Sequence, residues 1–198
     1  GNLGPYVHFV YALSKDFASS GLRVGVAYSE NKDIRLPMQK LNDLCQISSQ
    51  TQQLVETMMK STTEEGNLWT DEFLKENCSR IQARAQALVS TLDEHGIPHL
   101  TPDSGLFCWI GLTEFLPDLD PAMINSSGKE DLESMQVRER TLYMELVKGH
   151  GLLFTPGMSM RNERPGFFRC VFTAASDDEF TLSLERLRSF VTSKRSTN

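Results

Sequence analysis

The strongest structural signal in the chain is a run of apolar residues at steps of four and three between Asp71 and His95. This spacing lines one face of an α-helix, so a helix is expected over that interval. Thr70 can cap its start, and Gly96 with Pro98 can end it. At 1.5 Å per residue the helix would span about 36 Å, which suits a strut joining two domains. The apolar positions are Leu74, Cys78, Ile81, Ala85, Leu88 and Leu92.

Strand-like and helical patterns alternate along the rest of the chain. Residues 6–13 (YVHFVYAL) and 23–29 (RVGVAYS) are rich in aromatic and β-branched types, which predicts two strands flanking a loop, SKDFASSG. The other expected elements are a helical segment over 38–60 opened by Pro37, a strand over 105–112, a helix over 131–148, short strands in GLLFT and FFRCVFTA, and a helix after the capping box Ser176–Glu179. This alternation predicts an α/β fold, α+β in its C-terminal part.

The composition limits the possible functions. The chain has 198 residues, 39% of them hydrophobic and 23% charged, which is enough for one folded domain or two small ones. A net charge of -6 disfavours binding to a nucleic-acid backbone, which needs a basic surface. No apolar run approaches the roughly 20 residues that cross a bilayer, and no signal-peptide pattern opens the chain. We therefore expect a cytoplasmic protein that binds neither nucleic acid nor membrane.

No metal site is expected from the spacing of the possible ligands. The cysteines are widely separated and include no CxxC pair, so buried thiols are expected rather than a zinc or redox site. His95 and His99 flank a helix end with no third ligand nearby, and we interpret them as surface residues. The four cysteines are Cys45, Cys78, Cys108 and Cys170.

Lys15 and Arg23 sit eight residues apart, around the loop between the first two expected strands. A lysine that traps a carbonyl covalently must be held at the end of a rigid element. A guanidinium can bind phosphate oxygens in a bidentate way. Together they fit a pyridoxal phosphate pocket, although a lysine on a loop is more often a solvated surface charge.

Four stretches, in order along the chain, widen this pattern: VHFVYALSKDFASSGLRVGVAYSEN, ISSQTQQL, SGLFCWIGL and PGFFRCVFTA. In them the chain resembles the fold-type I pyridoxal phosphate enzymes, specifically the 1-aminocyclopropane-1-carboxylate synthase-like branch of the class I/II aminotransferases. The resemblance implies that Lys15 binds the cofactor covalently and moves the substrate's Cα proton, and that Arg23 binds the cofactor phosphate. It also implies that Arg169 grips the substrate α-carboxylate. The alternative is an arginine paired with a structural acid.

The resemblance also implies a layout. Residues 1–35 would be the last strands of the large cofactor-binding domain, 36–70 a helical interface segment, and 71–198 the long helix and the small C-terminal domain. Ala12 stands where the family commonly has a phosphate-binding serine. Too few residues precede Lys15 to supply the rest of the pocket, so we expect the C-terminal part of a larger enzyme, inactive alone. Open strand edges favour a homodimer.

The expected function is that of a pyridoxal phosphate-dependent enzyme acting on a small amino-acid substrate. Its reaction would be either an aminotransfer or an elimination from S-adenosylmethionine. The competing hypothesis is a non-catalytic interaction or regulatory domain that kept the scaffold. The replacement of serine by Ala12 is the local hint for it, whereas Lys15, Arg23 and Arg169 speak against it.

Overall fold

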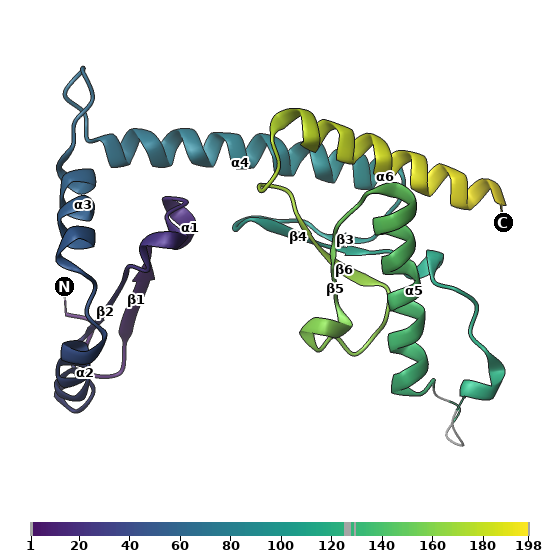
Figure 1. Ribbon diagram of the computed structural model, residues 1–198, viewed down its shortest axis with the longest axis horizontal. Helices are drawn as coiled ribbons and strands as arrows, with labels where there is room; N and C mark the ends of the chain where they lie inside the picture. Colours follow the sequence, from purple (N-terminus) through teal and green to yellow (C-terminus); the bar gives the residue numbers. More distant parts are fainter. Residues whose placement is uncertain (1, 125–127, 129, 198) are drawn as a thin grey trace. The chain divides into compact units, whose positions relative to one another are not determined.

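The computed structural model describes residues 2–124, 128 and 130–197, and Figure 1 shows their arrangement into helices and strands. The chain divides into two compact units, Gly1–Arg80 and Ile81–Asn198. The boundary falls inside one long helix, α4 (Trp69–Glu94), which therefore contributes residues to both units.

The helix α4 confirms the strongest prediction from the sequence. It begins at Trp69, so Thr70 lies in the first turn and does not cap it. Stacking of the Trp69 and Phe73 rings, 5.0 Å between centroids, helps to fix that first turn. At the other end Gly96 adopts a left-handed φ of 59°, and the Leu92 carbonyl accepts a hydrogen bond from the amide after Gly96. A glycine therefore ends the helix, as expected.

The first unit opens with an antiparallel pair of strands, β1 (His8–Ala12) and β2 (Gly25–Ser29), in which Ala12 lies opposite Gly25. Between them lie the helical turn α1 (Leu13–Asp16) and the 3-10 turn η1 (Ser20–Leu22). The segment SKDFASSG, expected to be a loop, is thus partly helical. A hydrogen bond of 3.2 Å from the Phe17 amide to the Leu13 carbonyl closes the α1 turn.

Two helices replace the single helical segment expected over 38–60. The first, α2 (Lys32–Cys45), contains Pro37 in its interior, where the missing N–H leaves one carbonyl without its usual partner. The second, α3 (Ser49–Lys60), begins after Ser48, whose side chain accepts a hydrogen bond from the Thr51 amide. A capping serine therefore starts a new helix inside what the apolar spacing predicts as a continuous one.

The second unit is built on a four-stranded antiparallel sheet in the order β3-β4-β6-β5. Its remaining helices are α5 and α6, and the predicted capping box at the start of α6 is confirmed, because Ser176 and Glu179 bond to each other's backbone amides. The elements are β3 (His99–Leu100), β4 (Phe107–Gly111), η2 (Thr113–Phe115), η3 (Pro121–Met123), α5 (Leu132–His150), β5 (Thr155–Pro156), η4 (Met158–Met160), β6 (Phe167–Val171) and α6 (Asp177–Thr197).

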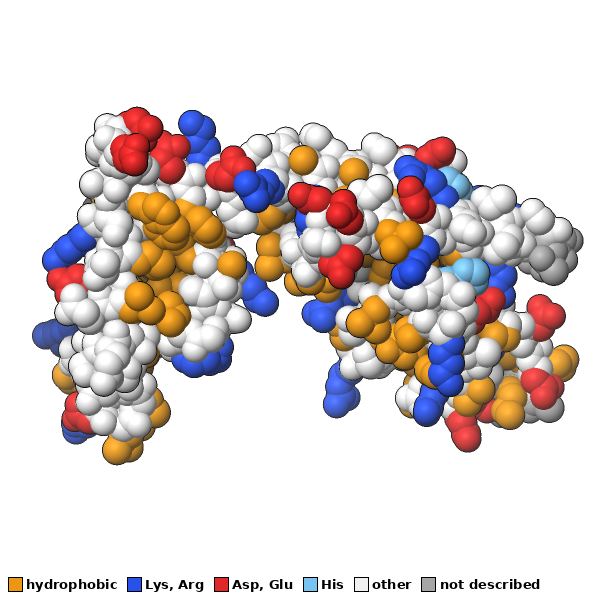
Figure 2. Space-filling model, turned by 45° about the horizontal axis from the view of Figure 1, so that its top comes forward, with side chains coloured by type: hydrophobic (Ala, Val, Ile, Leu, Met, Phe, Trp, Pro, Cys, Tyr) orange, Lys and Arg blue, Asp and Glu red, His pale blue; other side chains and the backbone are white. Residues whose placement is uncertain are grey.

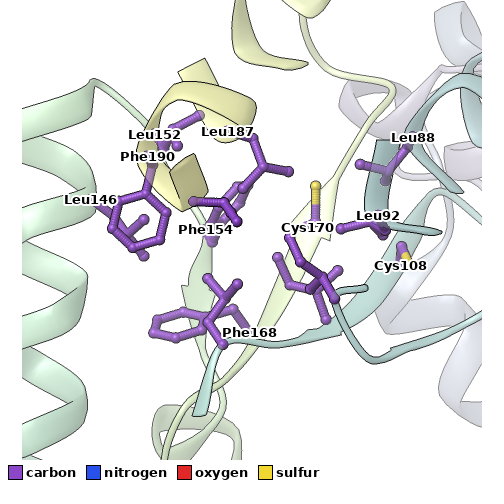
Figure 3. Packing of buried hydrophobic residues seen from close by; sticks show 14 of the residues in the cluster. Leu88, Leu92, Cys108, Leu146, Leu152, Phe154, Phe168, Cys170, Leu187 and Phe190 are labelled. Atoms are coloured by element: carbon purple, nitrogen blue, oxygen red, sulfur yellow. The ribbon is translucent and has the colours of Figure 1, made fainter. Parts of the chain in front are cut away.

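The core of this unit lies between one face of the sheet and the helices α4, α5 and α6. Figure 3 shows part of it, with residues of all three helices converging on side chains of β4 and β6. Arg84 of α4 ties the helix to the end of β6 through hydrogen bonds to the carbonyls of Phe172 (3.3 Å) and Ala175 (2.8 Å), and it also bonds to the Asp177 carboxylate at 2.6 Å. The central buried side chains are Leu88, Leu92, Cys108, Ile110, Leu142, Leu146, Phe168, Cys170, Leu187 and Phe190.

The opposite face of the same sheet is half-open. Because successive residues of a strand point to opposite faces, Phe107 and Trp109 of β4 and Phe167 and Arg169 of β6 share the face that does not carry the core. The rings of Trp109 and Phe167 stack at 6.3 Å between centroids. Arg169 therefore stands on an aromatic surface outside the hydrophobic core.

Candidate active site

Lys15 lies on the α1 turn, which two buried residues fix in place. Leu13 is buried, and its amide donates to the Val24 carbonyl at 3.2 Å. Phe17 is also buried and stacks on Phe73, with 5.8 Å between ring centroids. The Lys15 side chain itself is exposed, and it forms no ion pair with any described residue. The α1 turn therefore has a fixed backbone and an exposed Lys15 side chain that is unpaired within the described part of the chain.

The carboxylate next to Lys15 is held by a different residue. The Tyr11 hydroxyl donates to Asp16 Oδ2 at 2.8 Å, and this hydrogen bond raises the pKa of Tyr11 above its ordinary value. Asp16 is thereby engaged by a tyrosine on β1. Nothing in the sequence pattern indicated this contact, because the two residues are five apart across a strand-to-helix junction.

Arg23 follows η1 in a left-handed backbone conformation, with φ 56° and ψ 39°. One of its guanidinium nitrogens, Nη1, donates to the Ser20 carbonyl at 2.8 Å. The hydroxyl of Ser19 donates to the Leu13 carbonyl at 2.9 Å, which ties the loop back to the α1 turn. Lys15 and Arg23 therefore belong to one hydrogen-bonded loop within the first unit.

The same loop concentrates unusual backbone conformations. Among the described residues, positive φ values outside glycine occur at Ala18 (51°), Arg23 and Arg161 (65°), and two of these three lie in this loop. Such conformations cost of order 1–3 kcal/mol each and occur preferentially at functional sites. The backbone at Arg23 is thus compatible with a functional site, although the same conformation ends the η4 turn at Arg161.

Arg169 is placed by its position in the sheet of the second unit. On β6 it lies opposite Trp109 of β4 and Thr155 of β5. Its guanidinium carbon lies 5.1 Å from the centre of the Phe107 ring, and Nη2 is 3.4 Å from the Thr155 hydroxyl. These contacts orient the guanidinium across the open face of the sheet.

The Nε atom of Arg169 is buried and has no hydrogen-bond partner. No carboxylate of the described residues forms an ion pair with this arginine either, so the structure offers no structural acid for it. An unpaired buried N–H is costly, and a charged one more so. A guanidinium without an acidic partner is suited to bind an external carboxylate through its terminal nitrogens, because a carboxylate accepts two parallel hydrogen bonds from such a group.

Glu139 is a site residue that the sequence did not indicate. It lies on α5 and is only 1% exposed. Oε1 accepts a hydrogen bond from the Met158 amide and Oε2 accepts one from the Gly166 amide, both at 2.8 Å. Burial raises the pKa of this carboxyl, while the two backbone bonds act in the opposite direction. Its position in a polar-looking stretch of α5 gives no signal of these contacts.

The other candidates from the sequence behave mainly as structural residues. The side chain of His99 is only 8% exposed and its Nδ1 donates to the Ile97 carbonyl at 3.0 Å, so its interpretation as a surface residue is wrong. Cys108 and Cys170 are buried as expected, but the other two cysteines are exposed. Burial raises the pKa of Cys108 to about 11 and that of Cys170 to about 12. Within the described part of the chain, no cluster of three metal-ligating side chains occurs, and no helix is long and apolar enough to cross a membrane.

Comparison with solved structures identifies the class of fold. The chain is similar to an aspartate aminotransferase from Rhizobium meliloti, with a TM-score of 0.67 and 22% identity over 93% of this chain and 42% of that one. It is also similar to an aromatic aminotransferase from Pyrococcus horikoshii OT3, with a TM-score of 0.70 and 15% identity over 95% of this chain and 43% of that one. The fold is therefore that of part of an aminotransferase, which confirms the expected fold class.

Sequence comparison then identifies the family. The model for aminotransferase class I and II matches residues 2–187, so the chain belongs to that family, whose members are pyridoxal phosphate-dependent enzymes. It is 34% identical to 1-aminocyclopropane-1-carboxylate synthase 11 of Arabidopsis thaliana over 93% of this chain, and 35% identical to the synthase CMA101 of Cucurbita maxima over 96%. The chain spans 36% of the length of each of these relatives.

Proposed function

We propose that this chain is the C-terminal part of a pyridoxal phosphate-dependent enzyme of α-amino acid metabolism, either an aminotransferase or a 1-aminocyclopropane-1-carboxylate synthase. The observation that carries the proposal is the Arg169 guanidinium on the open face of its sheet, which has no acidic partner among the described residues. An α-amino acid supplies a carboxylate for that group. Family membership and the relatives at 34–35% identity support the same chemistry.

The residues of the first unit fit the cofactor. Lys15 has an exposed amine with no acidic partner among the described residues, and Nζ is proposed as the point of covalent attachment. Arg23 uses one nitrogen for the Ser20 carbonyl, which leaves further N–H donors for a phosphate. When bound, the cofactor supplies an electron sink for the bond broken at the substrate Cα. Lys15 then carries the Cα proton as a general base and acid.

The layout of the whole protein is also part of the proposal. Residues 1–35, 36–70 and 71–198 are assigned to the end of the large domain, an interface segment and the small domain. The remaining pocket residues would come from sequence outside this chain, so residues 1–198 alone should be inactive. Ala12, which precedes α1 without a side-chain cap hydrogen bond, is one missing phosphate contact.

A homodimer and a cytoplasmic location are proposed on separate observations. Figure 2 shows hydrophobic side chains gathered on the surface of the first unit, where Val10 is 78% and Leu44 83% exposed. Such a surface favours further association. Size-exclusion chromatography with light scattering on the whole protein tests the dimer.

The cytoplasmic location is proposed from the cysteines. Two free cysteines, Cys45 and Cys78, are exposed, which suits a reducing compartment.

The test of the proposed function is Lys15→Ala in the whole protein, with Lys40→Ala as the control. Lys40 is an exposed lysine of α2 in the same unit. We expect Lys15→Ala to abolish the visible absorbance of lysine-bound cofactor and multiple turnover, with an unchanged circular dichroism spectrum. Lys40→Ala should retain both. Turnover by Lys15→Ala would refute the assignment.

The alternative, a non-catalytic domain that keeps the scaffold, is favoured only by Ala12. It predicts that the whole protein binds no pyridoxal phosphate even with Lys15 and Arg23 intact. If cofactor binds, a panel of L-amino acids with a keto acid acceptor, together with S-adenosylmethionine, decides between the two enzymes. Keto acid production marks an aminotransferase, and a cyclopropane product marks a synthase.

A further inference from the structure

Glu139 connects α5 to both ends of the segment that joins β5 to β6. Its two oxygens each accept one backbone hydrogen bond, from Met158 at the start of the segment and from Gly166 at its end. We refer to this pair of bonds as the Glu139 bridge. The carboxylate is buried, and no other side chain among the described residues bonds to it. The bridge is therefore made to the backbone alone.

The two ends of the segment approach neighbouring backbone closely. The Gly157 amide donates to the Phe167 carbonyl at 2.8 Å, and a Cβ at Gly157 would lie 2.6 Å from that oxygen. Gly166 has a φ of +88°, and a Cβ there would lie 2.8 Å from Thr113 Cα. Both glycines are therefore required by close backbone approach. The Glu139 bridge closes a segment whose ends are already fitted tightly.

This segment joins the strand that carries Arg169 to the strand that carries its neighbour Thr155. Met158 comes two residues after Pro156, and Pro156 pairs with Phe168. Gly166 comes three residues before Arg169. A shift at either end would change the pairing of β5 with β6, in which Thr155 lies opposite Arg169. The guanidinium would then lose its place beside the Thr155 hydroxyl.

We infer that Glu139 is a positioning residue for substrate binding, which fixes Arg169 by holding both ends of the β5–β6 segment. The inference rests on the proposed role of Arg169 in gripping the substrate α-carboxylate. Its chemistry requires an ionised carboxylate, because that group accepts at both oxygens. A glutamine of nearly the same volume would turn an NH2 group toward one of the two amides, so one bond of the bridge would be lost.

The test is Glu139→Gln in the whole protein, with Glu145→Gln as the matched control. Glu145 lies on the same helix and pairs with Lys194 at 2.8 Å, away from the β5–β6 segment. We expect Glu139→Gln to raise KM for the preferred amino acid of the panel about tenfold while kcat changes less than twofold, as when only binding is lost. Cofactor affinity, which depends on Lys15, should be unchanged. Glu145→Gln should leave KM, kcat and cofactor affinity unchanged.

A double-mutant cycle separates positioning from general stability. If Glu139 acts through Arg169, then Glu139→Gln should raise KM by less than twofold in an Arg169→Lys background. A full tenfold effect in that background would overturn the inference. If Arg169→Lys alone leaves KM and kcat unchanged, the proposed role of Arg169 in substrate binding is refuted, and the role of Glu139 is refuted with it. If Arg169→Lys raises KM and Glu139→Gln does not, the proposed function stands and the positioning role is refuted.

A measurement on the unmodified protein covers the case in which Glu139→Gln does not fold. Hydrogen exchange resolved to single residues should show the Met158 and Gly166 amides exchanging as slowly as those of β6. Exchange of these two amides at the rate of exposed loops would mean that the Glu139 bridge does not hold the segment, and it would overturn the inference.

Discussion

Replacing Arg169 with lysine separates a substrate-binding arginine from a structural one. Arg169 offers a planar guanidinium that has no acidic partner among the described residues, and its Nη2 lies 3.4 Å from the Thr155 hydroxyl. A lysine keeps the positive charge but replaces the planar pair of donors with one ammonium. The substitution therefore removes at least one charge-assisted hydrogen bond to the substrate carboxylate.

The size of the effect follows from the bond that is removed. A hydrogen bond to a charged group contributes about 1.5–3 kcal/mol. Since about 1.4 kcal/mol corresponds to a factor of ten, kcat/KM for the amino acid should fall about tenfold to about 150-fold. Stability should change by less than about 1 kcal/mol, because among the described residues the arginine makes only a long hydrogen bond to Thr155 and a cation–π interaction with the exposed Phe107 ring.

The assay is steady-state kinetics of the whole protein together with urea unfolding of the same samples. Arg140→Lys is the control, because Arg140 is an exposed arginine of α5 in the same unit. We expect this control to retain wild-type kinetics and stability. A kcat/KM within twofold of wild type for Arg169→Lys, combined with a stability loss above about 2 kcal/mol, would show that the arginine is structural.

Further predictions concern the packing of the second unit. Arg84→Met should lower the free energy of unfolding by about 2–4 kcal/mol in urea titrations, because two part-buried carbonyls after β6, those of Phe172 and Ala175, lose their donor. A change below about 0.5 kcal/mol would contradict this. Cys108 and Cys170, with pKa values raised by burial to about 11 and about 12, should react with a thiol reagent at pH 8 only after unfolding, and prompt labelling in the native protein would show that they are accessible. Because burial raises the pKa of Glu139, the folded state binds this proton more tightly than the unfolded state. The free energy of unfolding of wild type, measured relative to Glu139→Gln, should therefore fall as pH rises from about 4.5 through the folded pKa. A rise over that range would contradict this.

The parts of the fold that the sequence predicts well are those set by local periodicity. The apolar repeat between Asp71 and His95 predicts α4 to within two residues at each end, because one buried face fixes the helix regardless of what it packs against. The capping box of α6 is equally local, since Ser176 and Glu179 bond to each other. Alternation along β4 and β6 likewise shows which residues share a face.

The parts that the sequence does not predict depend on contacts between distant residues. The pairing of Trp109, Arg169 and Thr155 across three strands is set by register, which alternation alone does not determine. Glu139 bonds to amides 19 and 27 residues away, and those amides carry no sequence signature. The α1 turn beneath Lys15 is only four residues long, too short for a helical period to show.

The two arginines of the proposed site are held by different means, and this difference has consequences for substitution. Arg23 depends on its own left-handed backbone and on the nearby Ser20 carbonyl, so its placement is local to one loop. Arg169 depends on a strand register that Glu139 helps to fix from another helix. Its unpaired Nε also leaves the unliganded protein less stable than a satisfied arginine would. Substitutions that break the Glu139 bridge, at Glu139 or at Gly157 and Gly166, should therefore impair binding at Arg169, whereas the placement of Arg23 should be insensitive to them.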